Sequence, residues 1–64
     1  DGGARSDGRM DRAAAARILG VAPDAEREEV LRAWRDLMKL NHPDQGGSAY
    51  LAARINEAKE TLLG

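Results

Sequence analysis

The strongest chemical signal in the chain is the triplet His42, Pro43 and Asp44, because its residue types together suit a polar binding site. The imidazole of His42 can donate or accept hydrogen bonds at its two ring nitrogens. The carboxylate of Asp44 is suited to a charge-assisted hydrogen bond with an arginine of a partner. Pro43 restricts the backbone between them, so the triplet predicts two polar side chains that project in a fixed relation.

Catalysis by the same segment is a much weaker interpretation. The chain has one histidine and no cysteine, and the nearby hydroxyl of Ser48 is better explained as a helix cap. Gly46 and Gly47 predict a turn, since a phosphate cradle would need a preceding strand and a following Lys-Ser or Lys-Thr pair. We therefore expect no enzymatic activity, no cofactor and no metal site.

A stripe of basic residues precedes the triplet. Arg32, Arg35 and Lys39 follow one another at spacings of three and four, which places them on one face of a helix. Such a stripe can steer the domain onto an acidic surface of a partner, with an association rate that falls as salt rises. The alternative is a solvated helix face whose cations pair with Glu28 and Asp36.

Capping residues predict the helices that position these groups. Asp11, Asp24 and Ser48 are of types that accept hydrogen bonds from the first turn of a helix, and Gly20 suits the left-handed residue that ends one. The second helix is expected to start between Asp24, as its cap, and Glu28. The predicted helices span 12–19, from this start to about Leu40, and about 49–63.

Apolar spacing predicts how the three helices pack. The loop at 41–47 is short enough to favour an antiparallel pair of helices, and the first helix is expected to lie across that pair. The fold class is therefore all-α, with Trp34 as the largest single contributor to the core. The two facing apolar stripes are Val30, Trp34 and Leu37 on the second helix and Leu51, Ile55, Ala58 and Leu62 on the third.

Length and charge limit the classes of function. A chain of 64 residues buries only about 60% of its unfolded surface, which leaves little room for an interior cleft. The net charge of −1 argues against general binding to nucleic acid or to an acidic membrane.

Residues 1–9 contain three glycines and no large apolar side chain, and predict a flexible linker. No run of about 18 apolar residues occurs, and the start at Asp1 leads us to expect a piece of a longer protein.

The triplet at the end of a basic amphipathic helix resembles the J-domain, the co-chaperone module that docks on DnaK-type ATPase chaperones. The resemblance covers residues 10–64. Within the family, the likeness is greatest to the membrane-anchored J-proteins of the mitochondrial import motor and their bacterial relatives. It rests on the segments Ile18 to Val21, Val30 to Leu40, Leu40 to Ser48, Tyr50, Ala52 to Ala53 and Ile55 to Glu60.

The resemblance implies that the domain binds the ATP-bound chaperone and stimulates hydrolysis. It also implies a transmembrane helix upstream, outside this chain, and a regulatory J-like subunit as a further partner. The expected location is the cytoplasmic side of a bacterial inner membrane, or the matrix side of the mitochondrial membrane in a eukaryote. The residues implied to contact the chaperone are His42, Pro43, Asp44, Arg32, Arg35, Lys39 and Asn41.

The sequence departs from the family pattern at three positions. Gln45 stands where many members carry Lys or Arg, and Asp36 lies beside the stripe where a second basic residue is common. Trp34 occupies a place often held by Tyr, or by His in the import-motor branch. None of these changes removes the triplet, so activity is expected to survive with weaker affinity.

Two other functions stay open on the sequence. One is a helix-turn-helix nucleic-acid binder, although the 41–47 loop is longer than the turn of that motif and the domain is not basic. The other is a J-like regulatory module that binds a partner without stimulating its ATP hydrolysis, as happens when the triplet is lost.

Overall fold

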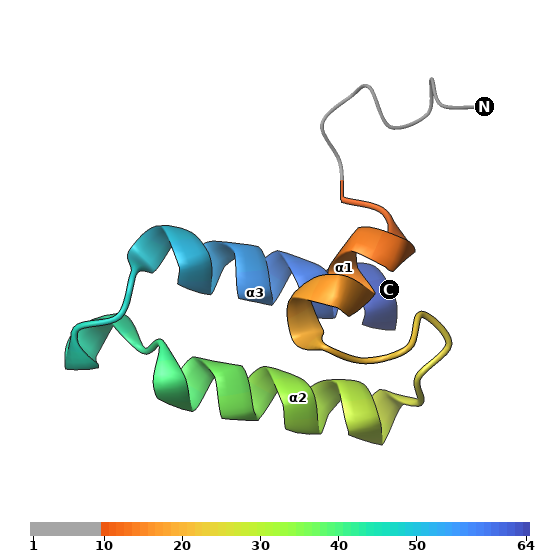
Figure 1. The fold of residues 1–64 in the computed structure, drawn as a ribbon, viewed down its shortest axis with the longest axis horizontal. Helices are drawn as coiled ribbons and strands as arrows, with labels where there is room; N and C mark the ends of the chain where they lie inside the picture. Colours follow the sequence, from red (N-terminus) through yellow and green to blue (C-terminus); the bar gives the residue numbers. More distant parts are fainter. Residues whose placement is uncertain (1–9) are drawn as a thin grey trace.

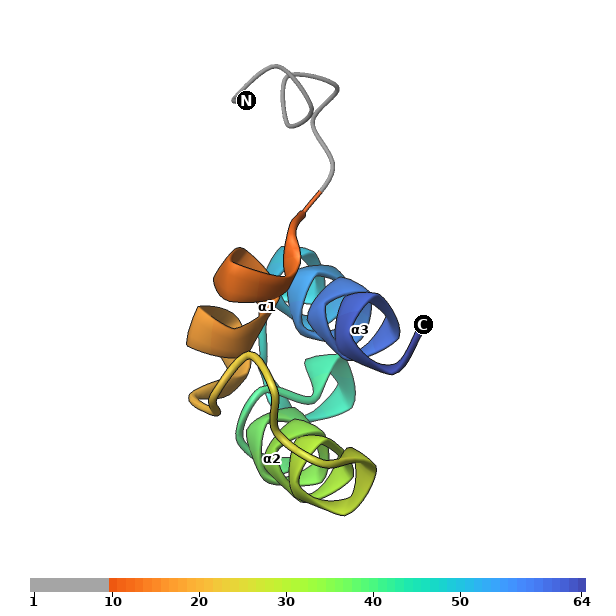
Figure 2. The ribbon, with the colours of Figure 1, turned by 90° about the vertical axis from the view of Figure 1, so that its right-hand side faces the viewer.

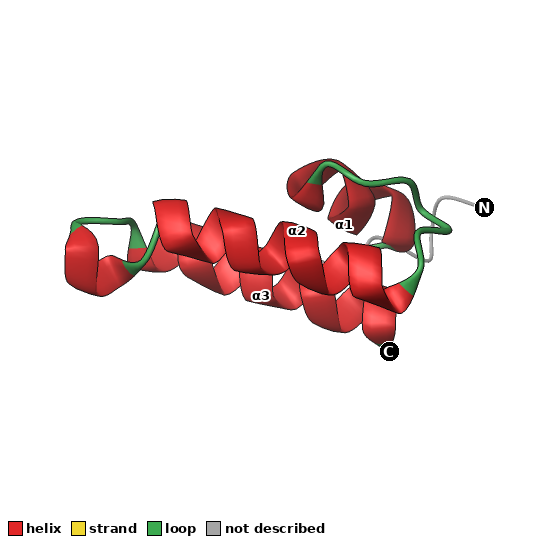
Figure 3. Cartoon of the chain, turned by 90° about the horizontal axis from the view of Figure 1, so that it is seen from below, coloured by secondary structure: helices red, strands yellow, loops and turns green. Residues whose placement is uncertain are grey.

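The computed structural model describes residues 10–64, and the helices form one pair with a third helix laid across it (Figure 1). The helices α2 and α3 run side by side in opposite directions, and α1 lies on one side of this pair, at the end away from the connecting loop (Figure 3). No strand occurs within residues 10–64, which confirms the all-α prediction. The linker predicted for residues 1–9 lies outside the described residues. In chain order the elements are α1 Arg12–Leu19, α2 Arg27–Leu40, η2 Pro43–Gln45, a short 3-10 helix, and α3 Ala49–Leu63.

The predicted ends of α1 and α3 are confirmed by their caps. The carboxylate of Asp11 accepts a hydrogen bond of 2.8 Å from the backbone N–H of Ala14. Gly20 has φ of +76°, the left-handed conformation that ends a helix at low cost only for glycine. The hydroxyl of Ser48 accepts from the N–H of Leu51 at 3.1 Å, so this side chain caps α3.

The predicted cap of α2 is wrong. The helix begins at Arg27 with Glu26 at the N-cap position, and no side chain caps it. The N–H of Ala25 donates to the carbonyl of Ala22 at 2.9 Å and closes a turn around Pro23. Asp24 lies inside this turn, too early in the chain to reach the first N–H groups of α2.

The core forms where α1 packs on α3 through small side chains (Figure 2). Ala15 and Ala58 are completely buried, which lets the two helix backbones approach closely. Val30 of α2 is 1% exposed and is the largest fully buried side chain of the described residues. The core cluster comprises Ala15, Ala16, Leu19, Val30, Ile55, Ala58 and Leu62.

The core prediction fails at Leu51, which is 44% exposed. Leu51 is the first residue of the predicted apolar stripe, and it lies in the first turn of α3, at the end of the helix pair that α1 does not cover (Figure 1). Ala52 is buried instead. Because Ala52 lies in the same turn as Leu51, the inward face of this turn is one residue later than the spacing predicts. The buried positions of α3 are Ala52, Ile55, Ala58 and Leu62, at spacings of three, three and four.

Trp34 is also not the centre of the core, because it is half-buried at the edge of the α2–α3 contact. Its indole N–H donates to the Asn56 side-chain oxygen at 2.7 Å. The ammonium of Lys59 lies 4.5 Å from the centre of its ring, within the range of a cation–π interaction. Trp34 therefore joins α2 to α3 from the solvent side.

Arg12 connects three parts of the fold. Its guanidinium donates to the carbonyl of Leu62 at 3.1 Å and to the carbonyl of Pro23 at 2.6 Å. One side chain of α1 thus binds both the last turn of α3 and the connector that leads to α2.

We expect Arg12→Met to lower the free energy of unfolding by about 1–2 kcal/mol, because methionine keeps the apolar stem and loses both charged hydrogen bonds. Urea denaturation followed by circular dichroism measures the change. Arg17→Met, also on α1, is the matched control and should change stability by less than about 0.5 kcal/mol. Equal effects of the two substitutions would contradict a connecting role for Arg12.

Candidate functional site

The His42 to Asp44 triplet forms the start of a tight turn between α2 and α3. His42 has an extended backbone (φ −69°, ψ 129°), as expected for a residue before proline, and Pro43 opens the 3-10 helix η2. The turn ends at Gly46, whose φ of +88° is left-handed and whose N–H donates to the carbonyl of Pro43 at 3.2 Å. The predicted ordered loop is therefore a defined 3-10 turn.

A local hydrogen bond joins the side chain of His42 to the backbone of Asp44. The backbone N–H of Asp44 donates to Nδ1 of His42 at 3.2 Å, which places the ring proton of the neutral imidazole on Nε2. The carboxylate oxygen of Asp44 lies 3.9 Å from the same Nδ1. The turn thus uses one nitrogen of the ring and leaves the Nε2–H group for an outside acceptor.

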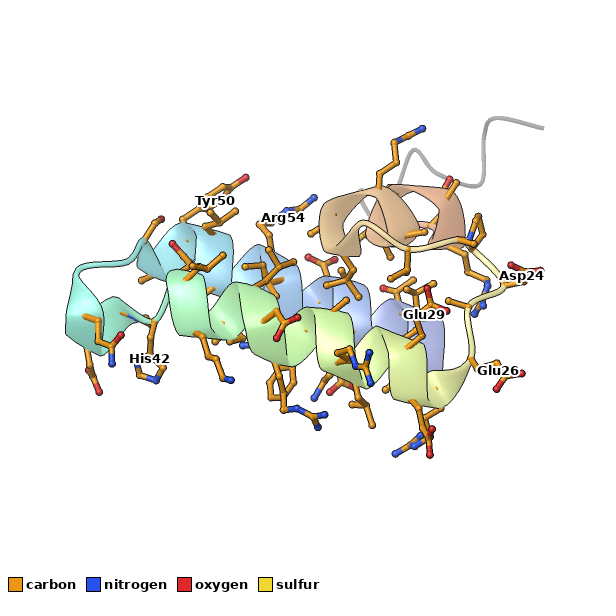
Figure 4. All side chains as sticks on the ribbon, turned by 60° about the horizontal axis from the view of Figure 1, so that its bottom comes forward. Asp24, Glu26, Glu29, His42, Tyr50 and Arg54 are labelled. Carbon is orange, nitrogen blue, oxygen red and sulfur yellow. The ribbon has the colours of Figure 1, made fainter. Side chains whose placement is uncertain are left out.

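Both side chains of the triplet are accessible. The side chain of His42 is 49% exposed and that of Asp44 is 89% exposed. Figure 4 shows His42 projecting from the loop on the opposite side of the molecule from Tyr50. A hydrogen-bond donor and an anionic acceptor are therefore presented together at one end of the helix pair.

The basic stripe lies on the solvent side of α2. Arg32, Arg35 and Lys39 are exposed, whereas Val30 and Leu37 of the same helix face the core. No acid within residues 10–64 forms an ion pair of 4.0 Å or less with these three cations, so the pairing with Glu28 and Asp36 is absent there. The three charges are available to a partner.

Acidic residues gather at the other end of α2. A shallow groove between this helix and the connector before it is lined by Val21, Ala33, Arg32 and four acids. Figure 4 shows Glu26 and Glu29 at this end and His42 at the opposite end. The four acids are Glu26, Glu28 and Glu29 at this end and Asp36 further along the helix, between Arg35 and Lys39 in the sequence.

Asn41 differs from the other predicted contact residues, because its side chain is bound within the loop. Its amide nitrogen donates to the carbonyl of Ser48 at 3.0 Å, and its amide oxygen accepts from the N–H of Ser48 at 3.0 Å. The structure therefore brings His42, Pro43 and Asp44 together at the loop surface, with the stripe on the adjoining helix, and ties Asn41 to the start of α3.

Residues 10–64 contain no cluster of three or more histidine or carboxylate side chains that could hold a metal ion. The hydroxyl of Ser48, the nearby nucleophile considered from the sequence, is occupied by the N–H of Leu51. The groups that the loop presents are suited to binding.

The family model described as the DnaJ domain matches residues 17–63. The chain belongs to the DnaJ-domain family. This J-domain is 50% identical over 56 residues to the mitochondrial import inner membrane translocase subunit TIM14 of Caenorhabditis briggsae, a match that covers 88% of the chain and 50% of the relative. It is 54% identical over 55 residues to TIM14-2 of Arabidopsis thaliana, covering 86% of the chain and 49% of that relative. No solved structure matches significantly.

The J-domain spans about half the length of the curated relatives it matches, so their remaining segments have no counterpart in these residues. None of the helices described in residues 10–64 is long and apolar enough to cross a membrane. The recognition of a J-domain from the triplet and the import-motor likeness are both confirmed.

Sequence reasoning missed two contributors to the loop of this J-domain. Gly47 was interpreted as a turn residue with freedom in φ, but a Cβ atom here would meet backbone atoms of Asn41 and His42. The sequence predicts the Asn41 amide as a contact for the chaperone and does not predict its hydrogen bonds with Ser48. A signal existed in the seven-residue separation of Asn41 and Ser48, which suits an amide side chain that closes a loop, but only the structure shows that closure.

Proposed function

We propose that this J-domain binds a DnaK-type chaperone in its ATP-bound form and accelerates hydrolysis of the ATP. Membership of the DnaJ-domain family supports a co-chaperone role, since J-domain proteins partner with chaperones of this type. The observation that carries the proposal is the intact triplet, held on a 3-10 turn with both polar side chains exposed. The domain contributes binding groups, and the reaction takes place in the partner.

The geometry supports a division of roles between stripe and triplet. Arg32, Arg35 and Lys39 have no acidic partner within residues 10–64, so their field can draw the domain toward an acidic patch. At contact, the Nε2–H group of His42 and the carboxylate of Asp44 can form directional, charge-assisted hydrogen bonds. We propose the three cations and the three residues of the triplet as the contact residues.

Two alternatives receive less support. The helices of a helix-turn-helix motif cross at about 90–120°, whereas α2 and α3 lie side by side and antiparallel (Figures 1 and 3). A J-like module that binds without stimulating would be expected to lack the triplet, which is present here.

Two further features of the proposal concern the whole protein. We propose that residues 10–64 form the J-domain and that a membrane segment upstream tethers it on the matrix side, or on the cytoplasmic side in a bacterium. The support is the name of the relatives, which are inner membrane translocase subunits. We expect the gene to encode an apolar stretch of about 20 residues before Asp1, and the absence of that stretch would contradict tethering.

A regulatory J-like subunit is the further proposed partner. It would lower the stimulation of the chaperone's ATPase when mixed with the domain.

His42→Gln should reduce the acceleration of single-turnover ATP hydrolysis by about tenfold or more. Glutamine can place an amide near the position of Nε2 but has no acceptor at the position of Nδ1, so the bond from the Asp44 N–H that orients the side chain is lost. A hydrogen bond to a charged group of the partner contributes about 1.5–3 kcal/mol and depends on that orientation. Gln45→Ala, at an exposed neighbour, is the control and should retain full stimulation.

His42→Asn separates the two nitrogens of the ring. The asparagine oxygen can accept from the N–H two residues on, as Nδ1 does in the turn, but it offers nothing at the position of Nε2. Loss of stimulation by this variant is expected if Nε2 meets the partner. No acceleration by the wild-type domain, or equal acceleration by His42→Gln, would refute the proposed function.

Arg35→Ala should weaken binding to the ATP-bound chaperone by about fivefold at roughly 50 mM salt and by less than about twofold at roughly 300 mM, because salt screens an exposed charge. Isothermal titration at the two salt concentrations measures the difference. Arg17→Ala, on α1, removes the same charge away from the stripe and should leave affinity unchanged. Unchanged affinity of Arg35→Ala at both concentrations would show that the stripe is only a solvated surface.

A further inference from the structure

The triplet has no hydrogen bond of its own to either of the long helices. Within residues 10–64, the side chain of His42 bonds only to the N–H of Asp44, and Asp44 is otherwise exposed. The orientation of the triplet relative to the basic stripe therefore depends on whatever holds the peptide between Asn41 and His42.

The Asn41 side chain supplies the first of two restraints on that peptide. Its amide exchanges two hydrogen bonds of 3.0 Å with the backbone of Ser48, one in each direction. Ser48 is the N-cap of α3, and its carbonyl also accepts from Ala52 in the first turn. The C-cap residue of α2 is thereby bound to the N-cap residue of α3 by hydrogen bonds, in addition to the covalent loop between them.

Gly47 supplies the second restraint. Its N–H donates to the carbonyl of His42 at 3.0 Å, a carbonyl that also accepts from Gln45 at 2.9 Å. A Cβ atom on Gly47 would overlap the carbonyl carbon and oxygen of Asn41 and would lie 2.8 Å from the oxygen of His42. The φ of Gly47 is not in the left-handed region, so the requirement for glycine at this position is steric.

We infer that Asn41 is a positioning residue for the triplet: with Gly47, it fixes the Asn41–His42 peptide against the start of α3 and so sets the direction in which His42 and Asp44 face a partner. This inference rests on the proposed function and deepens it. Asn41 suits the role because its side chain offers one donor and one acceptor at the distance that Ser48 requires. Aspartate would keep the acceptor but turn an anionic oxygen toward the Ser48 carbonyl.

The test compares Asn41→Ala, Asn41→Asp and Gly47→Ala with the wild-type domain in two measurements. The first is hydrogen exchange of the Ser48 amide in the free domain, which needs no partner. The second is the domain concentration that gives half-maximal stimulation of the chaperone's ATPase. Gln45→Ala, in the same loop, is the control, and circular dichroism verifies that each variant keeps its helices.

We expect Asn41→Ala and Gly47→Ala each to speed exchange of the Ser48 amide by about tenfold and to raise the half-maximal concentration by about tenfold, the effect of losing a pair of weak hydrogen bonds. Asn41→Asp keeps the acceptor for the Ser48 N–H and loses the donor to the Ser48 carbonyl, so both of its effects should lie between those of the wild type and Asn41→Ala. The double variant should be little worse than either single one, because both act on one peptide. The salt dependence should match the wild type, since the stripe is intact.

Several results would overturn the inference. Full stimulation by Asn41→Ala would overturn it. So would weakened stimulation by Asn41→Ala with the Ser48 amide still protected from exchange, because that result would mean that Asn41 contacts the partner directly. Additive effects of the two single substitutions would also contradict it. If the wild-type domain itself fails to accelerate hydrolysis, the proposed function is refuted and the inference falls with it.

Discussion

The antiparallel packing of α2 on α3 is the constraint on which the rest of this structure depends. Because the two helices lie side by side, the chain must reverse direction between Leu40 and Ala49. The reversal is made by a 3-10 turn, the left-handed Gly46 and the hydrogen bonds between Asn41 and Ser48. The packing of α1 on the far end of the pair stabilises the pair without covering the loop (Figure 1).

The small size of the domain and its function agree. Seven residues form the core cluster, and four of the buried side chains of residues 10–64 are alanines, so a binding role at the surface suits a domain with so small a core. That surface is polarised along α2: the acids gather near Glu26 and Glu29, and the free cations continue toward His42. A net charge of −1 therefore conceals a basic end next to the triplet. A partner with an acidic patch would therefore be attracted to the end of the domain that carries the His42 to Asp44 triplet.

Much of the fold could be predicted from the sequence because its determinants are local. Asp11, Gly20 and Ser48 act on residues within one turn, and the caps that they predict are present. The start of α2 lies within the predicted range, but the predicted Asp24 cap is wrong because Asp24 belongs to the turn at Ala22 to Ala25. The exposure of Leu51 and the half-buried position of Trp34 depend on which residues of each turn contact the neighbouring helix, and spacing alone does not contain that. In the site, the triplet was visible as a rare local string, whereas the closure by Asn41 and Gly47 requires the two helix ends to be placed in space.

We propose that the loop end of the domain, and no other face, meets a DnaK-type chaperone in its ATP form. The most direct measurement is nuclear magnetic resonance of the labelled domain during titration with the ATP-bound chaperone. The account predicts that signals of His42, Asp44, Arg35 and Lys39 broaden or shift first, that those of Glu26 and Glu29 do not, and that the ADP-bound chaperone has a weaker effect. Changes centred on Glu26 and Glu29, or none at the triplet, would contradict the account.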